Sequence, residues 1–244
     1  MEKISIIVPV YNEVKTIKTL LNNLLNLDLK SIKIKKEIIV IDSNSKDGSY
    51  EILKEFKIKK KIILLKQKNP KGKGHAVRYG IKFATGDIIA IQDADLEYNV
   101  NDYEKLLIPI IKKKTNFVLG TRHRYLNPFK MREMKERPLH AFFLNLGHVI
   151  LQSLFNILYQ IKLTDIFTMY KIFRKKSIQN IDFFCDRFDF DCELVCKLII
   201  NKNLPIEIPI RYKSRDFAQG KKVSFFKDPP KILWAMIKIK ILGR

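Results

Sequence analysis

The sequence contains little cysteine, and the cysteines it has exclude two kinds of site. There are three, Cys185, Cys192 and Cys196, an odd and clustered set. No second cysteine pair or neighbouring histidine completes a zinc set, and an odd number does not form a disulfide framework. We therefore expect reduced thiols in a cytosolic protein.

We expect neither a targeting segment nor a lipid-spanning helix. The N-terminus passes directly into a strand pattern, without the charged start, apolar stretch and cleavage site of a signal peptide. The longest uncharged run, residues 141–159, is interrupted at spacings of three and four by Asn145, His148, Gln152 and Asn156. This single polar stripe predicts an amphipathic helix, buried in the core or lying on a membrane, rather than a lipid-spanning one.

Acidic residues are scarce relative to basic ones. Asp and Glu number 25 against 47 Lys and Arg, which gives a formal net charge of +22. Such a balance suits an anionic partner: nucleic acid, anionic lipid headgroups or phosphorylated substrates. The sign of the charge does not choose among them, and part of the excess fits a solvated lysine-rich face.

The chain of 244 residues, 46% of them hydrophobic, is long enough to bury a sizeable core. Short β-branched runs at 4–10, 37–41, 62–65, 88–91 and 117–119 alternate with helical periods. This rhythm predicts an α/β fold with a doubly wound, mostly parallel sheet and helices on both faces. In such sheets, ligands bind beyond the carboxyl ends of the strands.

The second half predicts fewer strands. Helical patterns cover 141–159, 191–200 and 230–242, and a strand pattern covers 205–212. With no repeat and no Gly/Ser linker, we expect one catalytic domain over residues 1–227. Residues 228–244 are expected to add a basic, amphipathic C-terminal helix.

The most informative motif is a pair of carboxylates at a strand end. Asp93 and Asp95 follow the apolar run Ile88–Ile91 with one small residue between them. Carboxylates so placed can hold a divalent cation against a diphosphate. Alternatively, both cap a turn or a helix.

Other strand ends carry polar groups as well. Tyr11 and Glu13 follow the first strand and Asp42 ends the second, where a dinucleotide-binding fold would have a Gly-x-Gly-x-x-Gly turn. An aromatic ring and carboxylates can instead stack on and hydrogen-bond a nucleobase. These positions predict a nucleotide site.

Together these residues resemble the family-2 glycosyltransferases, which have the glycosyltransferase-A fold. The most similar branch contains dolichol-phosphate mannose and polyprenyl-phosphate glucose synthases. The resemblance runs from Ile4 to about Lys227 and rests on four segments in order: VPVYNE, IDSNSKDGS, GKGHAVRYG and DADLEY. It implies an inverting, metal-dependent enzyme that uses a nucleoside-diphosphate sugar.

The resemblance also implies roles for individual positions on the donor side. The nucleobase and ribose would be contacted by Pro9, Tyr11, Glu13 and Asp42, and the nucleotide would be covered by the segment of Lys73 and Arg78. A magnesium or manganese ion would be held by Asp93 and Asp95, with Glu97 near it. The ion would stabilise charge on the leaving diphosphate.

On the acceptor side, Arg122 and Arg137 are expected to bind a lipid phosphate, because guanidinium groups match phosphate geometry. Arg215 and Lys221 are expected to close on the diphosphate. A hydroxyl acceptor would need a base, for which Asp165 and Asp191 are the candidates. Met169 and Tyr170 replace the family's usual Gly-Phe, a departure that affects the predicted acceptor pocket.

The resemblance leaves the acceptor open between a polyprenyl phosphate and a hydroxyl of a growing glycan. The apolar and basic stretch 230–242, with Trp234, predicts peripheral contact with the cytosolic face of a membrane, and is compatible with a membrane-protein partner. Competing hypotheses are a sugar nucleotidyltransferase, which usually has a Gly-rich loop after strand one, and a basic nucleic-acid-binding module. The second would leave the acids at the strand ends unexplained, so we expect no nucleic acid.

Overall fold

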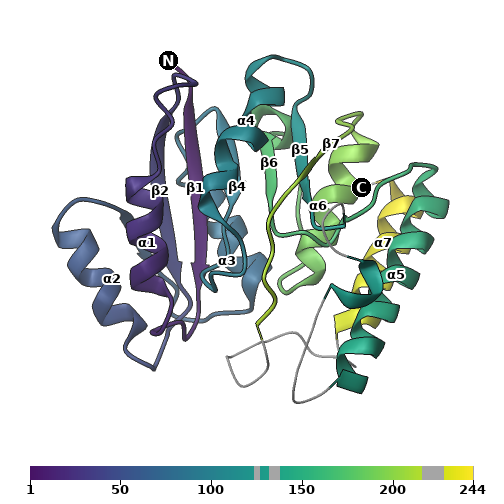
Figure 1. Ribbon diagram of the computed structural model, residues 1–244, viewed down its shortest axis with the longest axis horizontal. Helices are drawn as coiled ribbons and strands as arrows, with labels where there is room; N and C mark the ends of the chain where they lie inside the picture. The colour runs from purple at the N-terminus through teal and green to yellow at the C-terminus, as the bar shows by residue number, and fades with distance from the viewer. Residues whose placement is uncertain (124–126, 132–137, 216–227, 244) are drawn as a thin grey trace.

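A seven-stranded mixed sheet forms the centre of the computed structural model, which describes residues 1–123, 127–131, 138–215 and 228–243 (Figure 1). The strand order is β3-β2-β1-β4-β6-β5-β7. The strands are β1 (Lys3–Val10), β2 (Lys35–Asp42), β3 (Ile63–Lys66), β4 (Ile88–Ile91), β5 (Phe117–Thr121), β6 (Lys171–Arg174) and β7 (Ile206–Pro209).

All neighbouring strands run parallel except β6, which is antiparallel to both β4 and β5. The predicted mostly parallel sheet is therefore confirmed. The sequence did not predict β6, because its four residues begin with Lys171 and end with Arg174 and do not resemble a buried strand. The strand expected over 205–212 is present and shorter, as β7.

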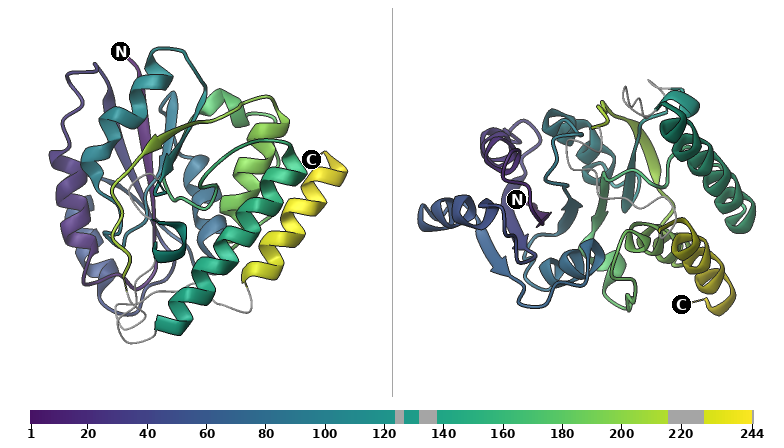
Figure 2. Two further views of the ribbon diagram at one scale, coloured as in Figure 1. Left: turned by 45° about the vertical axis from the view of Figure 1, so that its right-hand side comes forward. Right: turned by 90° about the horizontal axis from the view of Figure 1, so that it is seen from below.

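Helices cover both faces of the sheet (Figure 2). One face is covered by α1 (Ile17–Asn26), α2 (Ser49–Ile58) and α4 (Tyr103–Ile111). The other carries α3 (Lys73–Ile81) and α6 (Asp189–Ile200), with α5 (Pro138–Tyr159) and α7 (Asp228–Leu242) further out. Short 3-10 turns lie at η1 (Val100–Asp102), η2 (Pro128–Lys130) and η3 (Lys175–Ile178).

Burial on both faces explains the continuous apolar runs of the strands. In β1, Ile4 and Ile6 contribute to the core beneath α1 and α4, whereas Ile7 joins the opposite core beneath α3. Helix α3 approaches the sheet closely because Gly80 has no side chain: a Cβ there would lie 2.6 Å from Ile41 Cδ1. This contact fixes α3, whose first residue is Lys73.

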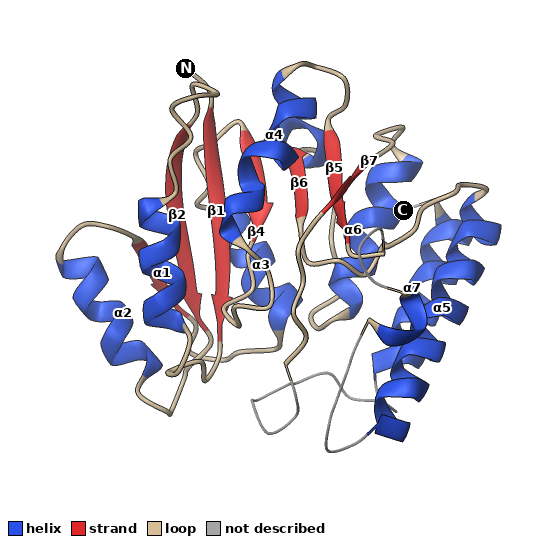
Figure 3. Cartoon of the chain, viewed as in Figure 1, coloured by secondary structure: helices blue, strands red, loops and turns tan. Residues whose placement is uncertain are grey.

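The carboxyl ends of β1, β2 and β4 meet at the lower edge of the sheet in Figure 3. Hydrogen bonds join the segments beyond these ends: Ser43 N–H donates to Val10 O at 2.8 Å and Gln92 N–H to Ile7 O at 2.9 Å. The polar residues that follow the three strands therefore lie close together, as expected from the parallel topology.

The helix predicted over 141–159 is α5, and the predicted C-terminal helix is α7. Helix α7 packs on both α5 and α6. It buries Ala235, Met236 and Ile239 while Trp234 and Ile237 are exposed, so apolar side chains lie on both its packed and its outer side. The amphipathic character and the division at residue 227 stay predictions.

Candidate active site

A cluster of carboxylates follows β4 at the carboxyl edge of the sheet. Asp93 and Asp95 follow the strand after one intervening residue, Gln92, and Leu96 then adopts a left-handed conformation with φ of 60°. This turn lets Glu97 N–H donate to Asp95 Oδ1 at 3.2 Å. A left-handed backbone is uncommon for leucine and is found where surrounding contacts hold it in place.

Arg215 joins three of the acidic residues at this edge. Its guanidinium donates to both carboxylate oxygens of Glu13, at 3.0 and 3.1 Å, and lies 3.3 Å from Asp95 Oδ2. Its backbone N–H donates to Glu97 Oε1 at 2.9 Å. Arg215 thus brings together the segment that follows β1 and the segment that follows β4, although all three are far apart in the sequence.

A second cation, Lys73, bridges two further carboxylates. The Lys73 ammonium lies 2.9 Å from Asp93 Oδ1 and 2.9 Å from Asp191 Oδ2. On the other side of Asp191, the fully buried Lys171 has its Nζ 3.6 Å from Oδ1 and donates to the Thr168 carbonyl. Helix α3, the β4 end, helix α6 and strand β6 are therefore held together by alternating charges.

Burial and like charges change the proton affinity of these groups. Burial, reinforced by Asp93 and Glu97, raises the pKa of Asp95 to about 7 despite Arg215. Burial also raises the pKa of Asp93, although Lys73 opposes the shift. Burial alone would raise the pKa of Asp191, but Lys73 and Lys171 outweigh it and hold that pKa below its usual range. The acids after β4 therefore carry charge that the protein stabilises poorly.

The predicted nucleobase residues surround the same edge. Tyr11 is half exposed directly after β1, Pro9 lies within that strand, and Asp42 is fully buried at the end of β2. Asp42 accepts hydrogen bonds from the backbone N–H groups of Asn44 and Ser45, so it also shapes its own turn. Its predicted contact with the nucleotide stays a prediction.

Arg78 lies away from the carboxylate cluster. Its guanidinium donates to the Phe183 carbonyl at 2.5 Å and pairs with Asp186. Both partners belong to the segment before α6, so the described contacts of Arg78 tie α3 to that segment. Its predicted role over the nucleotide stays a prediction.

Arg122 and Asp165 form a separate, fully buried ion pair. The Arg122 Nε and Nη2 donate to the two Asp165 oxygens at 2.7 Å each, and the Arg122 backbone N–H adds a bond of 3.1 Å. The guanidinium carbon also lies 5.0 Å from the centroid of the Tyr212 ring. Burial would raise the pKa of Asp165, but Arg122 overcomes it and holds that pKa far below its usual range.

The buried pair continues into two histidines. His148 Nε2 lies 3.0 Å from His123 Nε2 and 3.9 Å from Asp165 Oδ1. Ligand atoms of these three residues lie within 4.8 Å of one another, a spacing that suits a metal ion. In the structure, however, the two imidazoles are hydrogen-bonded to each other, and Asp165 accepts hydrogen bonds from Arg122. A metal ion would have to displace these contacts.

The donors after β4 fit magnesium or manganese better. Asp93, Asp95 and Glu97 offer carboxylate oxygens, the ligands that these hard cations prefer. Asp191 adds a buried oxygen, Oδ1, that accepts no hydrogen bond within the described residues, because Lys171 Nζ is 3.6 Å away. A divalent ion would offset both the burial and the like charges that raise the pKa of Asp95.

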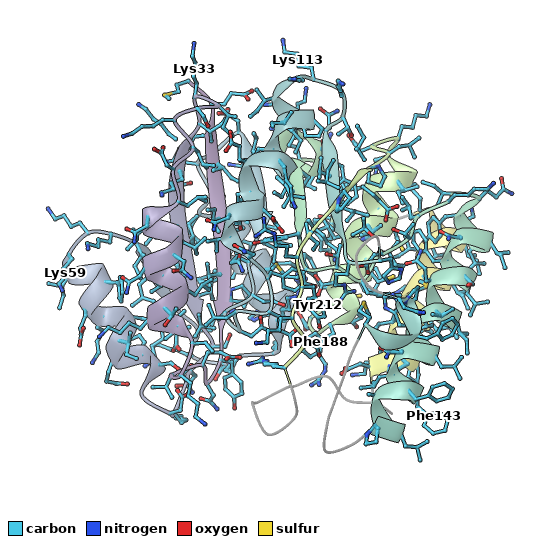
Figure 4. All side chains as sticks on the ribbon, in the orientation of Figure 1. Lys33, Lys59, Lys113, Phe143, Phe188 and Tyr212 are labelled. Atoms are coloured by element: carbon cyan, nitrogen blue, oxygen red, sulfur yellow. The ribbon has the colours of Figure 1, made fainter. Side chains whose placement is uncertain are left out.

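Two predicted residues, Arg137 and Lys221, lie outside the described residues. Sequence reasoning missed two residues of the site. The Tyr212 hydroxyl donates to Glu97 Oε2 at 2.9 Å, and Lys171 lies beside Asp191. Lys171 directly follows Met169 and Tyr170, which the sequence analysis had singled out, and this position was the available signal. Figure 4 shows Tyr212 near the carboxyl edge of the sheet, far from Lys33 and Lys113 at the opposite edge.

The sheet order and the acids at its carboxyl edge define a glycosyltransferase-A fold, and solved structures agree. Mannosyl-3-phosphoglycerate synthase from Rubrobacter xylanophilus superposes with a TM-score of 0.73 over 100% of this chain and 75% of its own, at 13% identity. Glucosyl-3-phosphoglycerate synthase from Mycobacterium tuberculosis, solved with Mn²⁺, UDP and phosphoglyceric acid, gives 0.65 over 98% and 78%, at 16% identity. At these identities the likeness shows the fold.

The chain belongs to glycosyl transferase family 2, whose model matches residues 5–182. A UDP-N-acetylglucosamine–dolichyl-phosphate N-acetylglucosaminyltransferase from Methanococcus voltae is 32% identical, with 90% of each chain covered. A dolichyl-phosphate beta-glucosyltransferase from Dictyostelium discoideum is 27% identical over 97% of this chain and 73% of its own. The predicted family and branch are thereby confirmed.

Proposed function

We propose that this chain transfers a sugar, with inversion, from a nucleoside-diphosphate sugar to a polyprenyl phosphate. The dolichyl-phosphate transferases among its relatives support the acceptor class. Binding of the nucleoside-diphosphate sugar is supported by the carboxylate cluster after β4, which lies between Lys73 and Arg215 at the carboxyl edge of the sheet. Such a cluster suits a cation with the diphosphate that it accompanies.

On the donor side, Asp93 and Asp95 would hold Mg²⁺ or Mn²⁺ with Glu97 beside them. The ion supplies stabilisation of the charge that develops on the leaving diphosphate. Tyr11 has an exposed ring for the nucleobase, and Glu13 lies 3.0 Å from Arg215. Arg215 is placed to exchange a carboxylate for a diphosphate oxygen without leaving the site.

The state of the two candidate bases favours a phosphate acceptor over a hydroxyl. Asp165 is held in a bidentate pair by Arg122, and Asp191 lies between two lysines. Neighbouring cations lower the pKa of both carboxyls, which makes each a weak proton acceptor. A lipid phosphate is already anionic near neutral pH and needs positioning rather than deprotonation.

We propose that the basic segment that begins at Arg122 positions the acceptor phosphate. Because Asp165 accepts from both Nε and Nη2 of Arg122 and so fixes this side chain, we propose that Arg122 orients the start of this segment. Arg137 and Lys221 are proposed to contact the acceptor phosphate and the diphosphate. We propose that the enzyme acts at the cytosolic face of a membrane, where such an acceptor resides.

The test is transfer of radiolabel from a panel of UDP- and GDP-sugars to a polyprenyl phosphate in detergent with Mn²⁺. We expect label in the organic phase and a loss of about a thousandfold in Asp95→Asn, because that variant lacks a cation ligand. Glu55→Gln, an exposed acid on α2, is the matched control. Label found only in water-soluble glycan would contradict the proposed acceptor and support the glycan alternative.

A further inference from the structure

Helix α5 turns its polar stripe toward the protein. Asn145 donates to the Phe129 carbonyl at 2.8 Å, and Gln152 donates to the Leu163 carbonyl at 2.8 Å. Gln152 also accepts from Ile166 N–H at 2.9 Å. Hydrogen bonds therefore attach this helix to the domain along the side that a water-exposed helix would present to solvent.

The opposite side of α5 is exposed and apolar. Residues 138–159 include no Lys, Arg, Asp or Glu, and Ile157 is 73% exposed. The other large exposed side chains of this helix are Leu139, Phe142, Phe143 and Ile150. By length and composition, Ala141–Tyr159 qualifies as a membrane-crossing helix, and with 28% of its apolar window buried it is not a core helix. Its polar stripe, however, is hydrogen-bonded to the domain. This geometry suits a helix that lies on a membrane.

Helix α7 extends the same side of the molecule. It packs beside α5, and its exposed apolar residues are Trp234, Ile237, Ile241 and Leu242. Lysines border them: Lys238 Nζ lies 4.5 Å from the Trp234 ring centroid and Lys240 Nζ lies 5.4 Å from that of Tyr159. Aromatic rings with lysine are typical of a membrane–water interface.

The position of these helices relates them to the active site. Figures 1 and 2 show α5 and α7 side by side as an outer layer, with the first turns of α5 toward the carboxyl edge of the sheet. In Figure 4, Phe143 points away from the body near that edge, on the same lower side as Tyr212. The first turns of α5 and the carboxyl edge of the sheet therefore lie toward the same end of the molecule.

We propose that the outward apolar side chains of α5 and α7, here called the α5–α7 surface, dock the enzyme on an anionic lipid bilayer. The surface would lie in the headgroup region with its lysines at the border. The net charge of +22 selects this occupant, because a second copy of the chain would bring the same positive charge. The inference rests on the proposed function only in naming where the acceptor resides.

The test compares two triple variants with the unmodified chain in vesicle co-sedimentation at low salt, without substrate. Phe143→Ser, Ile150→Ser and Ile157→Ser remove one aromatic and two aliphatic side chains from α5. Phe83→Ser, Leu204→Ser and Ile58→Ser remove a set of similar exposure elsewhere. Vesicles contain phosphatidylcholine with about 30% phosphatidylglycerol. We expect the α5 triple to weaken binding about tenfold or more, and the control triple to bind normally.

A second readout uses Trp234, the single tryptophan of the chain. Its fluorescence should shift to shorter wavelength with vesicles and be quenched by phospholipids brominated on their acyl chains. Circular dichroism of both triples checks that they fold. Absence of vesicle binding by the unmodified chain, or equal binding by the α5 triple, would overturn the proposal.

Two further outcomes separate this inference from its alternatives. A dimer in solution that the α5 triple converts to monomer, without vesicle binding, would assign the surface to a second copy and overturn the proposal. Transfer to a polyprenyl phosphate in detergent should be retained by the α5 triple. If the unmodified chain binds vesicles but transfers no sugar, the proposed function is refuted and the proposed docking surface is still supported.

Discussion

Arg215 is the side chain on which the charge balance of the site depends most. It pairs with Glu13 and approaches Asp95 and Glu97, the acids predicted to face the ribose and the metal. Its guanidinium places positive charge beside carboxylates that are proposed to hold a divalent ion. An ion bound there as proposed would compete with Arg215 for the same oxygens, and a diphosphate would offer the guanidinium another partner.

This competition predicts that Arg215→Gln binds Mn²⁺ more tightly in the absence of nucleotide, by about tenfold, because Asp95 and Glu97 lose their competing cation. Electron paramagnetic resonance of free Mn²⁺ measures the affinity. Arg211→Gln removes the same charge from an exposed position four residues earlier and should leave it unchanged. Equal or weaker Mn²⁺ binding in Arg215→Gln would contradict the competition.

The Arg122–Asp165 pair predicts a stability effect. Asp165→Asn should lower the free energy of unfolding by about 3–5 kcal/mol, because it leaves a buried guanidinium without its counter-charge. Since the folded pKa of Asp165 lies below its unfolded value of about 4, this stabilisation is present above pH 4 and is lost as pH falls. Urea unfolding at several pH values measures both effects. A fully stable variant that loses only turnover would instead identify Asp165 as a chemical base.

Strand ends and helix faces differ in how far the sequence predicts them. The polar residues at the ends of β1, β2 and β4 were predictable because each follows an apolar run. These runs end at Val10, Ile41 and Ile91. Strand β6 was not, since four residues with charged ends have no distinctive period. The pairs of Arg215 with Glu13 and of Lys73 with Asp191 also needed coordinates, because each joins residues more than 100 positions apart in the sequence.

The orientation of α5 was likewise beyond sequence periodicity. The positions of Asn145 and Gln152 show that one face of the helix differs from the other, but both a core helix and a surface helix satisfy that pattern. Only the acceptors at Phe129 and Leu163 decide that the polar face is covered by protein. The general rule that polar side chains face water is wrong for this helix.

That inversion predicts opposite effects for two neighbouring substitutions to leucine. Gln152→Leu should lower the free energy of unfolding by about 2 kcal/mol, because it leaves the buried Ile166 N–H without its Gln152 acceptor and removes one of the two side-chain donors to the Leu163 carbonyl. Ser153→Leu, on the exposed side, should leave stability nearly unchanged and strengthen vesicle binding. Thermal unfolding and co-sedimentation measure the pair. Equal stability of both variants would contradict the described hydrogen bonds.

Across the entire chain, the excess of 22 positive charges should act together with the α5–α7 surface. Raising NaCl from about 50 mM to about 500 mM should weaken binding to anionic vesicles about tenfold, because salt screens attraction to the headgroups. The apolar contribution is not screened, so residual binding should remain in the unmodified chain and disappear in the α5 triple. Binding that ignores salt would show that the net charge plays no part.

The place of α5 beside the carboxyl edge of the sheet also affects how the two substrates reach the enzyme. A docked enzyme meets the nucleotide sugar by diffusion in three dimensions and the polyprenyl phosphate by lateral diffusion in two. The acceptor's effective concentration then depends on its density per membrane area rather than on bulk volume. Turnover on vesicles should therefore follow the mole fraction of acceptor in the lipid, and diluting the same vesicles in buffer should change it little.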